Sequence, residues 1–106
     1  MSKMVESEKV IERRLYDFVK NRKGLCIKLL TNHLLGLPDR ICLLPYGRIF
    51  FVELKSTGIL PKKIQLYMHE KLRKLGFNVY IIDSTEGVNK LIEAYDKSIY
   101  VEKNES

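Results

Sequence analysis

The most constraining feature of this sequence is an apolar run that contains two charges. Residues 48–55 read Arg-Ile-Phe-Phe-Val-Glu-Leu-Lys, and apolar side chains would occupy both faces of a strand here, as in the centre of a sheet. Glu53 and Lys55 interrupt the run and, being two residues apart, share one face with Phe51. A carboxylate or an ammonium group is costly to bury unless it is paired or binds a metal. The strand therefore predicts either a partly buried salt bridge or a functional site.

Hydrophobic periodicity around this strand predicts the other elements. Apolar residues recur at three- or four-residue spacing in the expected helices and form short runs in the expected strands. In order, the chain is expected to form a helix over about 5–23, strands over 25–30, 40–45 and 48–55, a helix over 61–76, a strand over 77–83 and a helix over about 84–95. Gly24 is expected to end the first helix, and the polar tail, residues 96–106, is expected to fray. The order α-β-β-β-α-β-α predicts an α/β fold with one mixed sheet flanked by helices.

Length and composition limit the class of protein. The 106 residues suit a single domain with a core over about 5–95, and 45% hydrophobic residues exclude a disordered basic tail. No apolar run approaches the roughly 18 residues of a membrane span. Cys26 and Cys42 both lie in apolar runs, which favours reduced core residues and a cytoplasmic protein. The net charge of +6 favours a nucleic-acid partner, although a solvated lysine-rich surface explains it equally well.

Asp39 adds a second carboxylate near the charged strand. It opens the preceding strand, and folding the chain about a turn at 45–48 brings it beside Glu53. A loop aspartate that accepts backbone hydrogen bonds is the simpler explanation for Asp39 alone. Two carboxylates beside Lys55 would raise each other's pKa unless a cation lies between them. Hard oxygen ligands of this kind suit Mg²⁺ or Mn²⁺.

Helical spacing places further polar residues near apolar faces. Glu8 falls within the apolar stripe of the first helix, and Glu12 lies at its edge, although an acid at a helix start is also favoured by the helix dipole. Gln65 lies beside the stripe of the second long helix, as a site residue or an ordinary surface amide. Lys28 would point toward the site or extend into solvent. The expected stripe of the second long helix consists of Ile64, Met68, Leu72 and Leu75.

These residues, taken in order, resemble a known family. Gly-Leu-Pro-Asp-Arg at 36–40, Phe-Val-Glu-Leu-Lys at 51–55 and Gln65 at a helix start resemble the VRR-NUC family of the PD-(D/E)XK nuclease superfamily, in its small stand-alone phage and bacterial form. The resemblance spans about residues 8–93. It implies a restriction-endonuclease-like α-β-β-β-α-β core and metal-dependent hydrolysis of phosphodiester bonds. The chain departs from the family pattern at Lys23, where many members have glycine, and in the loop over 31–35.

The resemblance also implies a role for each residue. The catalytic residues that it implies are Asp39, Glu53, Lys55, Gln65 and Glu8, with Glu12 as an alternative to Glu8 one turn away. The implied ligands for Mg²⁺ or Mn²⁺ are Asp39, Glu53, the backbone carbonyl of Leu54 and Glu8. The basic residues expected to contact nucleic acid are Arg40, Lys28, Lys62 and Lys63.

The implied activity is structure-selective cleavage of branched DNA, similar to that of Holliday junction resolvases. A homodimer would place two active sites on symmetric strands, and no membrane or small-molecule cofactor is expected. Two alternatives remain: a flap or nicking endonuclease, and a non-catalytic nucleic-acid-binding module on the same fold. Apolar candidates for a dimer interface are Leu34, Leu35, Ile59, Leu60 and residues 95–101.

Overall fold

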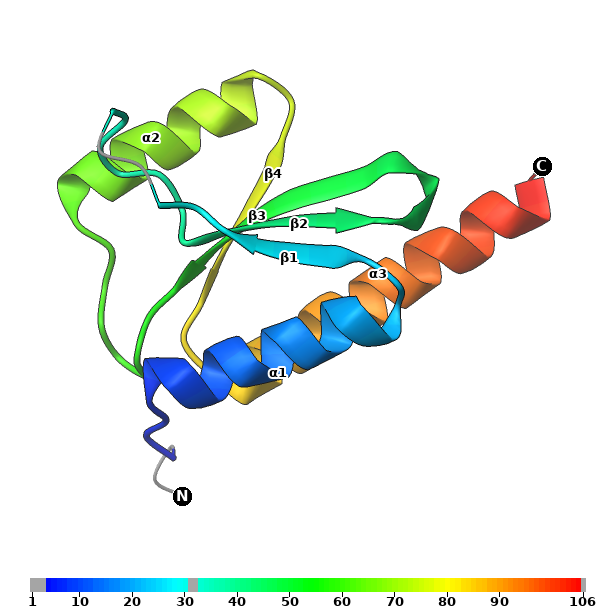
Figure 1. Cartoon of the computed structure of the whole chain (residues 1–106), viewed down its shortest axis with the longest axis horizontal. Coiled ribbons are helices and arrows are strands. Elements are labelled where there is room, and N and C mark those ends of the chain that lie inside the picture. Colours follow the sequence, from blue (N-terminus) through cyan, green and yellow to red (C-terminus); the bar gives the residue numbers. More distant parts are fainter. Residues whose placement is uncertain (1–3, 31–32, 106) are drawn as a thin grey trace.

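A four-stranded mixed sheet forms the centre of the molecule (Figure 1). The structure is a computed structural model that describes residues 4–30 and 33–105, with side chains up to residue 101; Thr31 and Asn32 of the expected loop lie outside the described residues. The elements are α1 (Glu8–Asn21), β1 (Leu25–Lys28), β2 (Arg40–Leu44), a short 3-10 turn (Pro45–Gly47), β3 (Arg48–Leu54), α2 (Lys63–Lys74), β4 (Asn78–Ile82) and α3 (Thr85–Glu105). This order confirms the predicted α/β class.

The strands lie in the order β1-β2-β3-β4. The first three are antiparallel, and β4 runs parallel to β3 because α2 carries the chain across the sheet between them. Ile41 of β2 pairs with Phe51 of β3. Extending that register by two residues places Asp39 opposite Glu53, as the hairpin arithmetic predicts.

Helices cover both faces of the sheet, which explains why β3 is apolar on both sides. In Figure 1, α1 and α3 lie side by side on one face and α2 lies on the other. The larger core forms between the sheet, α1 and α3; it includes Ile11, Leu15, Phe18, Val52, Leu54 and Val88. A smaller core lies under α2 and is built on Phe51, Leu72 and Val79. Glu53 shares the face of Phe51 and therefore lies under α2.

The first two helices end in the same hydrogen-bonded motif with different residues. After α2, the left-handed position is Gly76 (φ 97°), and the Phe77 N–H donates to the Leu72 carbonyl. After α1, the equivalent position is Lys23 (φ 64°), not the predicted Gly24. Gly24 is required for a different reason, because a Cβ there would lie 2.5 Å from the Leu43 carbonyl oxygen.

The last helix is longer than predicted. It continues past Tyr95 to Glu105, so the tail that was expected to fray is helical. No glycine or proline follows Gly87, and Ile99 packs partly against the larger core, which favours continuation of the helix. No helix of the described chain is long and apolar enough to cross a membrane.

The segment before α1 is anchored to the loop that follows β3. The Glu6 N–H donates to Thr57 Oγ1 (2.9 Å), and the Thr57 N–H donates to the Glu6 carbonyl (3.1 Å). The Glu6 carboxylate accepts from the N–H and the hydroxyl of Thr85 at the start of α3. These bonds fix the chain two residues beyond Lys55.

Candidate active site

A buried carboxylate lies at the end of β3. Glu53 has 0% of its surface exposed, and its Oε2 lies 3.2 Å from Lys55 Nζ. Asp39 joins them from the position directly before β2, where its Oδ2 accepts the Leu54 N–H at 2.7 Å. The structure thus brings the two carboxylates and the lysine together, as the sequence predicts.

Gln65 connects this group to the first turn of α2. Its Nε2 donates to Glu53 Oε2 (2.9 Å), and its Oε1 accepts the Lys62 N–H (2.7 Å). The second bond satisfies an N–H that would otherwise lack a partner at the helix start. Lys62 is the N-cap, so the helix begins at Lys63. Contrary to the prediction from sequence, Pro61 therefore precedes the helix and does not form its first turn.

The loop that leads to Asp39 packs directly on this helix start. Gly36 has φ +83°, and a Cβ added there would overlap the backbone carbonyl of Ile64. The two segments that supply Asp39 and Gln65 are therefore in backbone contact.

His69 belongs to the same group and was missed by the sequence analysis. It lies one turn after Gln65, has 0% of its surface exposed, and places its Nε2 3.5 Å from Glu53 Oε1. Neither ring nitrogen makes a hydrogen bond, and Glu53 Oε1 makes none either. The four-residue spacing from Gln65 was the available signal. The predicted stripe of α2 was wrong at two positions: Ile64 and Leu75 are exposed, and the inward face includes Gln65 and His69.

Burial dominates the electrostatics of this site. Burial and then the charge of Asp39 raise the pKa of Glu53 to about 7, although Lys55 opposes the change. Burial, followed by the positive charges of Arg73 and Lys55, lowers the pKa of His69, so its imidazole is neutral at pH 7. A carboxylate with this pKa would bind a cation in competition with a proton.

The acids of α1 lie outside the group around Glu53. Glu8 is exposed at the first residue of the helix, which corrects the expectation that it lies within the apolar stripe. A helical wheel gives the direction of a side chain but not whether the sheet extends beneath it. Glu12 Oε2 pairs with Arg40 Nη2 at 3.2 Å, and Arg40 also donates to the Cys26 carbonyl.

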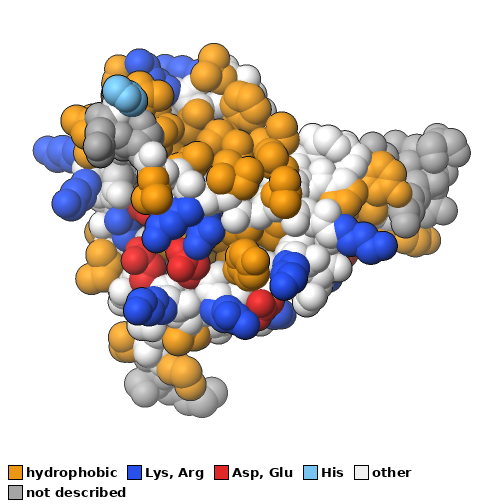
Figure 2. All heavy atoms as spheres, in the orientation of Figure 1, with side chains coloured by type: hydrophobic (Ala, Val, Ile, Leu, Met, Phe, Trp, Pro, Cys, Tyr) orange, Lys and Arg blue, Asp and Glu red, His pale blue; other side chains and the backbone are white. Residues whose placement is uncertain are grey.

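The expected basic contacts divide between the two faces of the sheet. Lys28 pairs in register with Arg40, so both lie on the face of α1, opposite the site. Lys62 and Lys63 are exposed where α2 begins, next to Gln65. On the face drawn in Figure 2, several acidic side chains gather beside basic ones, and a further acidic side chain lies apart from them. Glu53 itself has no exposed surface, so its charge is not part of the surface seen in this view.

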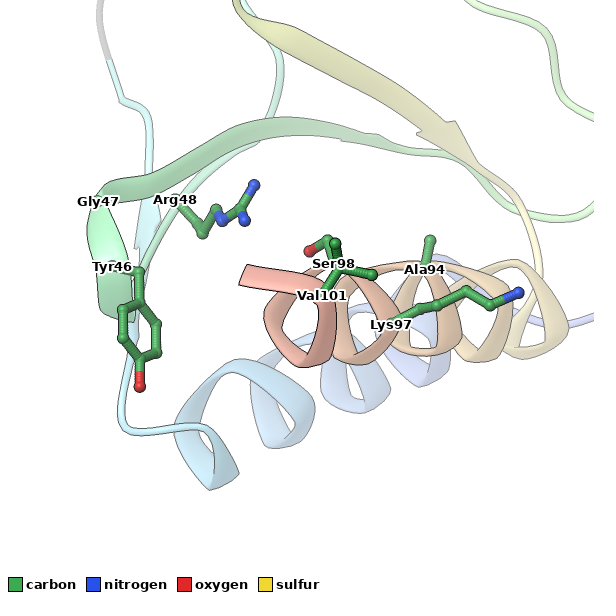
Figure 3. Close-up of a pocket in the computed structure, with 7 residues that line it drawn as sticks. All are labelled: Tyr46, Gly47, Arg48, Ala94, Lys97, Ser98 and Val101. Carbon is green, nitrogen blue, oxygen red and sulfur yellow. The ribbon is translucent and has the colours of Figure 1, made fainter. Parts of the chain in front are cut away.

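A separate hollow lies between the β2–β3 turn and the second half of α3 (Figure 3). Its volume is about 860 Å³, and Arg48 extends toward α3 beside it. None of its lining residues belongs to the group around Glu53: Tyr46, Gly47, Arg48, Ala94, Lys97, Ser98 and Val101. The hollow therefore does not contribute to the candidate site.

The donor atoms suit a magnesium-type cation. Among the described residues, no group of three or more His, Cys, Asp or Glu side chains is arranged to hold a metal. Mg²⁺ commonly takes one or two carboxylates and completes its shell with water and phosphate oxygens. Asp39 and Glu53 supply those carboxylates, and the buried Glu53 Oε1 has no hydrogen-bond partner. The site therefore fits Mg²⁺ or Mn²⁺ and does not fit a closed all-protein cage.

Comparisons with known proteins identify the fold and the relatives of this chain. No family model matches the sequence. A curated protein described as "Putative nuclease p44", from Acyrthosiphon pisum secondary endosymbiont phage 1, is 38% identical over 79 residues, which are 74% of this chain and 85% of the relative. A solved structure described as "VRR_NUC domain" is 35% identical, with a TM-score of 0.78 over 85% of this chain and 99% of that one. With this similarity in sequence and in structure, the chain belongs to the VRR-NUC family.

Proposed function

We propose that this protein is a Mg²⁺- or Mn²⁺-dependent endodeoxyribonuclease that cleaves branched DNA, with four-way junctions as its main substrate. The observation that carries the proposal is the buried Glu53–Lys55 pair, with Asp39 beside it and Gln65 bound to it. An ion pair with a buried carboxylate is a costly arrangement for stability alone. Membership of the VRR-NUC family supports hydrolysis as the reason for this arrangement.

The residues would divide the work of phosphodiester hydrolysis. Asp39, Glu53 and the Leu54 carbonyl would hold the cation. Glu8, or Glu12 as its alternative, lies outside this group and would reach the cation only through water. When bound, the cation supplies a polarised phosphate oxygen and a more acidic water. Lys55 would orient the attacking water or stabilise charge that develops on the phosphate. Gln65 would keep the Glu53 carboxylate in place through its Nε2 donor.

Basic residues around the site would bind the phosphates of DNA without contacting the bases. Lys62 and Lys63 are exposed beside Gln65 and would contact backbone phosphates. Arg40 and Lys28, on the opposite face, would reach DNA only where it wraps past the end of the sheet. This arrangement favours recognition of DNA shape over base sequence.

A two-fold dimer would let the protein cut two strands of one junction. Part of the sheet face beside α2 is apolar and uncovered, with Leu25, Ile27 and Ile49 exposed. Figure 2 shows apolar side chains spread broadly over this side of the molecule. Contiguous apolar surface of this kind marks association sites. Of the interface candidates, Leu34, Leu35, Ile59 and Leu60 are exposed, but Tyr95 is buried against Phe18.

The decisive experiment is a cleavage assay on junction, flap, duplex and single-stranded DNA with Mg²⁺ or Mn²⁺. We expect junction cleavage by the wild type and none by Lys55→Ala, which should still bind DNA within a few-fold of wild type. Lys90→Ala, an exposed lysine on α3, is the matched control and should cleave normally. Full activity of Lys55→Ala would remove the lysine from the mechanism. Cleavage of flaps or nicking of duplex without junction cleavage would favour the second candidate activity, and an inert wild type that binds DNA would favour a binding module.

A further inference from the structure

The two oxygens of the Glu53 carboxylate have different surroundings. Oε2 is held by Lys55 Nζ (3.2 Å) and Gln65 Nε2 (2.9 Å). Oε1 is buried without a hydrogen bond and faces His69 Nε2 at 3.5 Å. Gln65 and His69 lie one turn apart on the same face of α2 and therefore approach the two oxygens from one helix.

The surroundings of the imidazole determine which nitrogen carries the proton. Both ring nitrogens are buried, and neither makes a hydrogen bond. A proton on Nδ1 would bury an N–H group without an acceptor, which is rare and costly. A proton on Nε2 points the N–H at a carboxylate oxygen. The Nε2–H tautomer is thus favoured, and a closure of about 0.5 Å would complete a hydrogen bond.

A purely structural histidine explains this position poorly. A fully buried position on α2 would pack as well with a methionine or leucine side chain and would bury no polar nitrogen. An imidazole here costs desolvation of two nitrogens, and that cost is offset only if one of them acts on Glu53. Each carboxylate oxygen has two lone pairs, so Oε1 can accept from His69 and still bind a cation.

We propose that His69 is a positioning residue for the metal-binding carboxylate: its Nε2–H donates to Glu53 Oε1 and, with Gln65 on Oε2, sets the plane of that carboxylate. This inference rests on the proposed function, because it assigns the orienting partner of the same site. It makes α2 the element that orients Glu53, while β2 and β3 supply the carboxylates. Groups that orient a ligand in this way typically change metal affinity 10–100-fold when removed.

Three substitutions separate orientation from packing. His69→Gln places an amide N–H at about the same distance along the side chain as Nε2. His69→Asn places it near the position of Nδ1, and His69→Met fills the space without a donor. Mn²⁺ affinity is measured by calorimetry on each full-length variant without DNA, and the melting temperature is measured in EDTA. His33→Met, the same change at the exposed histidine of the β1–β2 loop, is the matched control, and Asp39→Asn is the positive control for lost binding.

We expect His69→Met and His69→Asn to bind Mn²⁺ about tenfold or more weakly, and His69→Gln to stay within about threefold of wild type. The melting temperature of His69→Met in EDTA should stay within a few degrees of wild type, because its volume is conserved. In cleavage, kcat should fall and KM for DNA should not change. If His69→Met does not fold, His69→Asn gives the same comparison with His69→Gln.

Two results would overturn the assignment of His69. Equal Mn²⁺ affinity in wild type and His69→Asn would show that no donor is needed, and equal losses in His69→Gln and His69→Asn would show that only the imidazole shape matters. A wild type that neither binds Mn²⁺ nor cleaves DNA would overturn the proposed function together with this inference. Normal binding by the wild type and by all three His69 variants, with binding lost in Asp39→Asn, would overturn the role of His69 alone.

Discussion

Single residues carry most of the chemistry of this protein, and Glu53 carries the greatest energetic cost. Its carboxylate has no exposed surface and is held by the ammonium group of Lys55 and the amide of Gln65. Such a group favours its protonated form in the folded state and is expected to destabilise the metal-free protein at neutral pH.

The first prediction concerns this cost. Between pH 4.5 and about 7 the folded protein retains a proton on Glu53 that the unfolded chain releases. Stability from this group is therefore full below about pH 4 and is lost as the pH rises through 7, by up to about 3 kcal/mol. Urea unfolding in EDTA should show this decline for the wild type and not for Glu53→Gln, and Mg²⁺ at pH 7.5 should restore stability only to the wild type. Parallel pH profiles for the two proteins would contradict it.

The second prediction concerns the helix ends. Lys23 adopts a left-handed conformation that glycine adopts without strain, as Gly76 does after α2. Lys23→Gly should raise the free energy of unfolding by about 0.5–1 kcal/mol, and Gly76→Lys should lower it by a similar amount. Urea unfolding of both variants tests the pair. The two changes in unfolding free energy should be equal and opposite, because both helix ends have the same pattern of hydrogen bonds.

Residue-level prediction from sequence succeeded where alternation or turn geometry places a side chain. Glu53 and Lys55 share a face because they are two apart on a strand, and Asp39 follows from the hairpin register. His69 was missed because the apolar stripe of α2 was assigned without knowing that the sheet presents a carboxylate beneath it. Glu8 was misplaced because periodicity does not show where a core ends along a helix axis. The roles of these residues remain predictions.

At the scale of elements, the site depends on how the β1–β2 loop meets α2. The loop backbone at Gly36 contacts the first turn of the helix, and that turn presents Gln65. The sequence predicts both elements but not this contact, which depends on the path of a loop without periodicity. The length of α3 was likewise missed, since its last turns depend on the partial burial of Ile99 in a mostly polar segment.

The third prediction tests that contact. Gly36→Ala places a Cβ against the Ile64 carbonyl and forces an unfavourable φ, so it should displace the start of α2 and with it Gln65. We expect a loss of more than 1 kcal/mol in stability and weaker Mn²⁺ binding by calorimetry. Gly58→Ala is the control, since its φ is similarly positive (+85°) but its Cβ meets open space. Strain alone would lower the stability of both variants equally and leave Mn²⁺ binding unchanged.

At the scale of the whole molecule, size and surface determine what the site can act on. Each copy of the 106-residue chain has one candidate site and would cleave one DNA strand, so two symmetric cuts would require a second copy. The net charge predicts a polyanionic partner, but it does not reveal Asp39 and Glu53, the acidic residues proposed to act in its cleavage. The uncovered apolar part of the sheet face could not be read from sequence, because it depends on how much of the sheet α2 covers.

The fourth prediction concerns this face. Ile27 is 41% exposed on β1, and Ile27→Glu should convert a dimer into a monomer in light scattering. The monomer should retain metal binding and nick DNA but no longer make paired cuts in a junction. Val10→Glu, at a residue 51% exposed on α1, is the matched control and should remain dimeric. A wild type that is monomeric at all concentrations would exclude coordinated resolution.

The double bonding of Gln65 has a consequence for observing this site in solution. Its Oε1 begins a helix and its Nε2 holds a carboxylate, so the amide cannot turn over without breaking both bonds. The two Nε2 protons of any glutamine give separate NMR signals because the amide C–N bond rotates slowly. Here the proton that bonds to Glu53 should be shifted from the position typical of a surface glutamine and should exchange more slowly with water. Because Nε2 bonds to Glu53, these signals should move when the carboxylate binds a cation. Gln65 thus provides a native spectroscopic reporter of the site that needs neither label nor substrate.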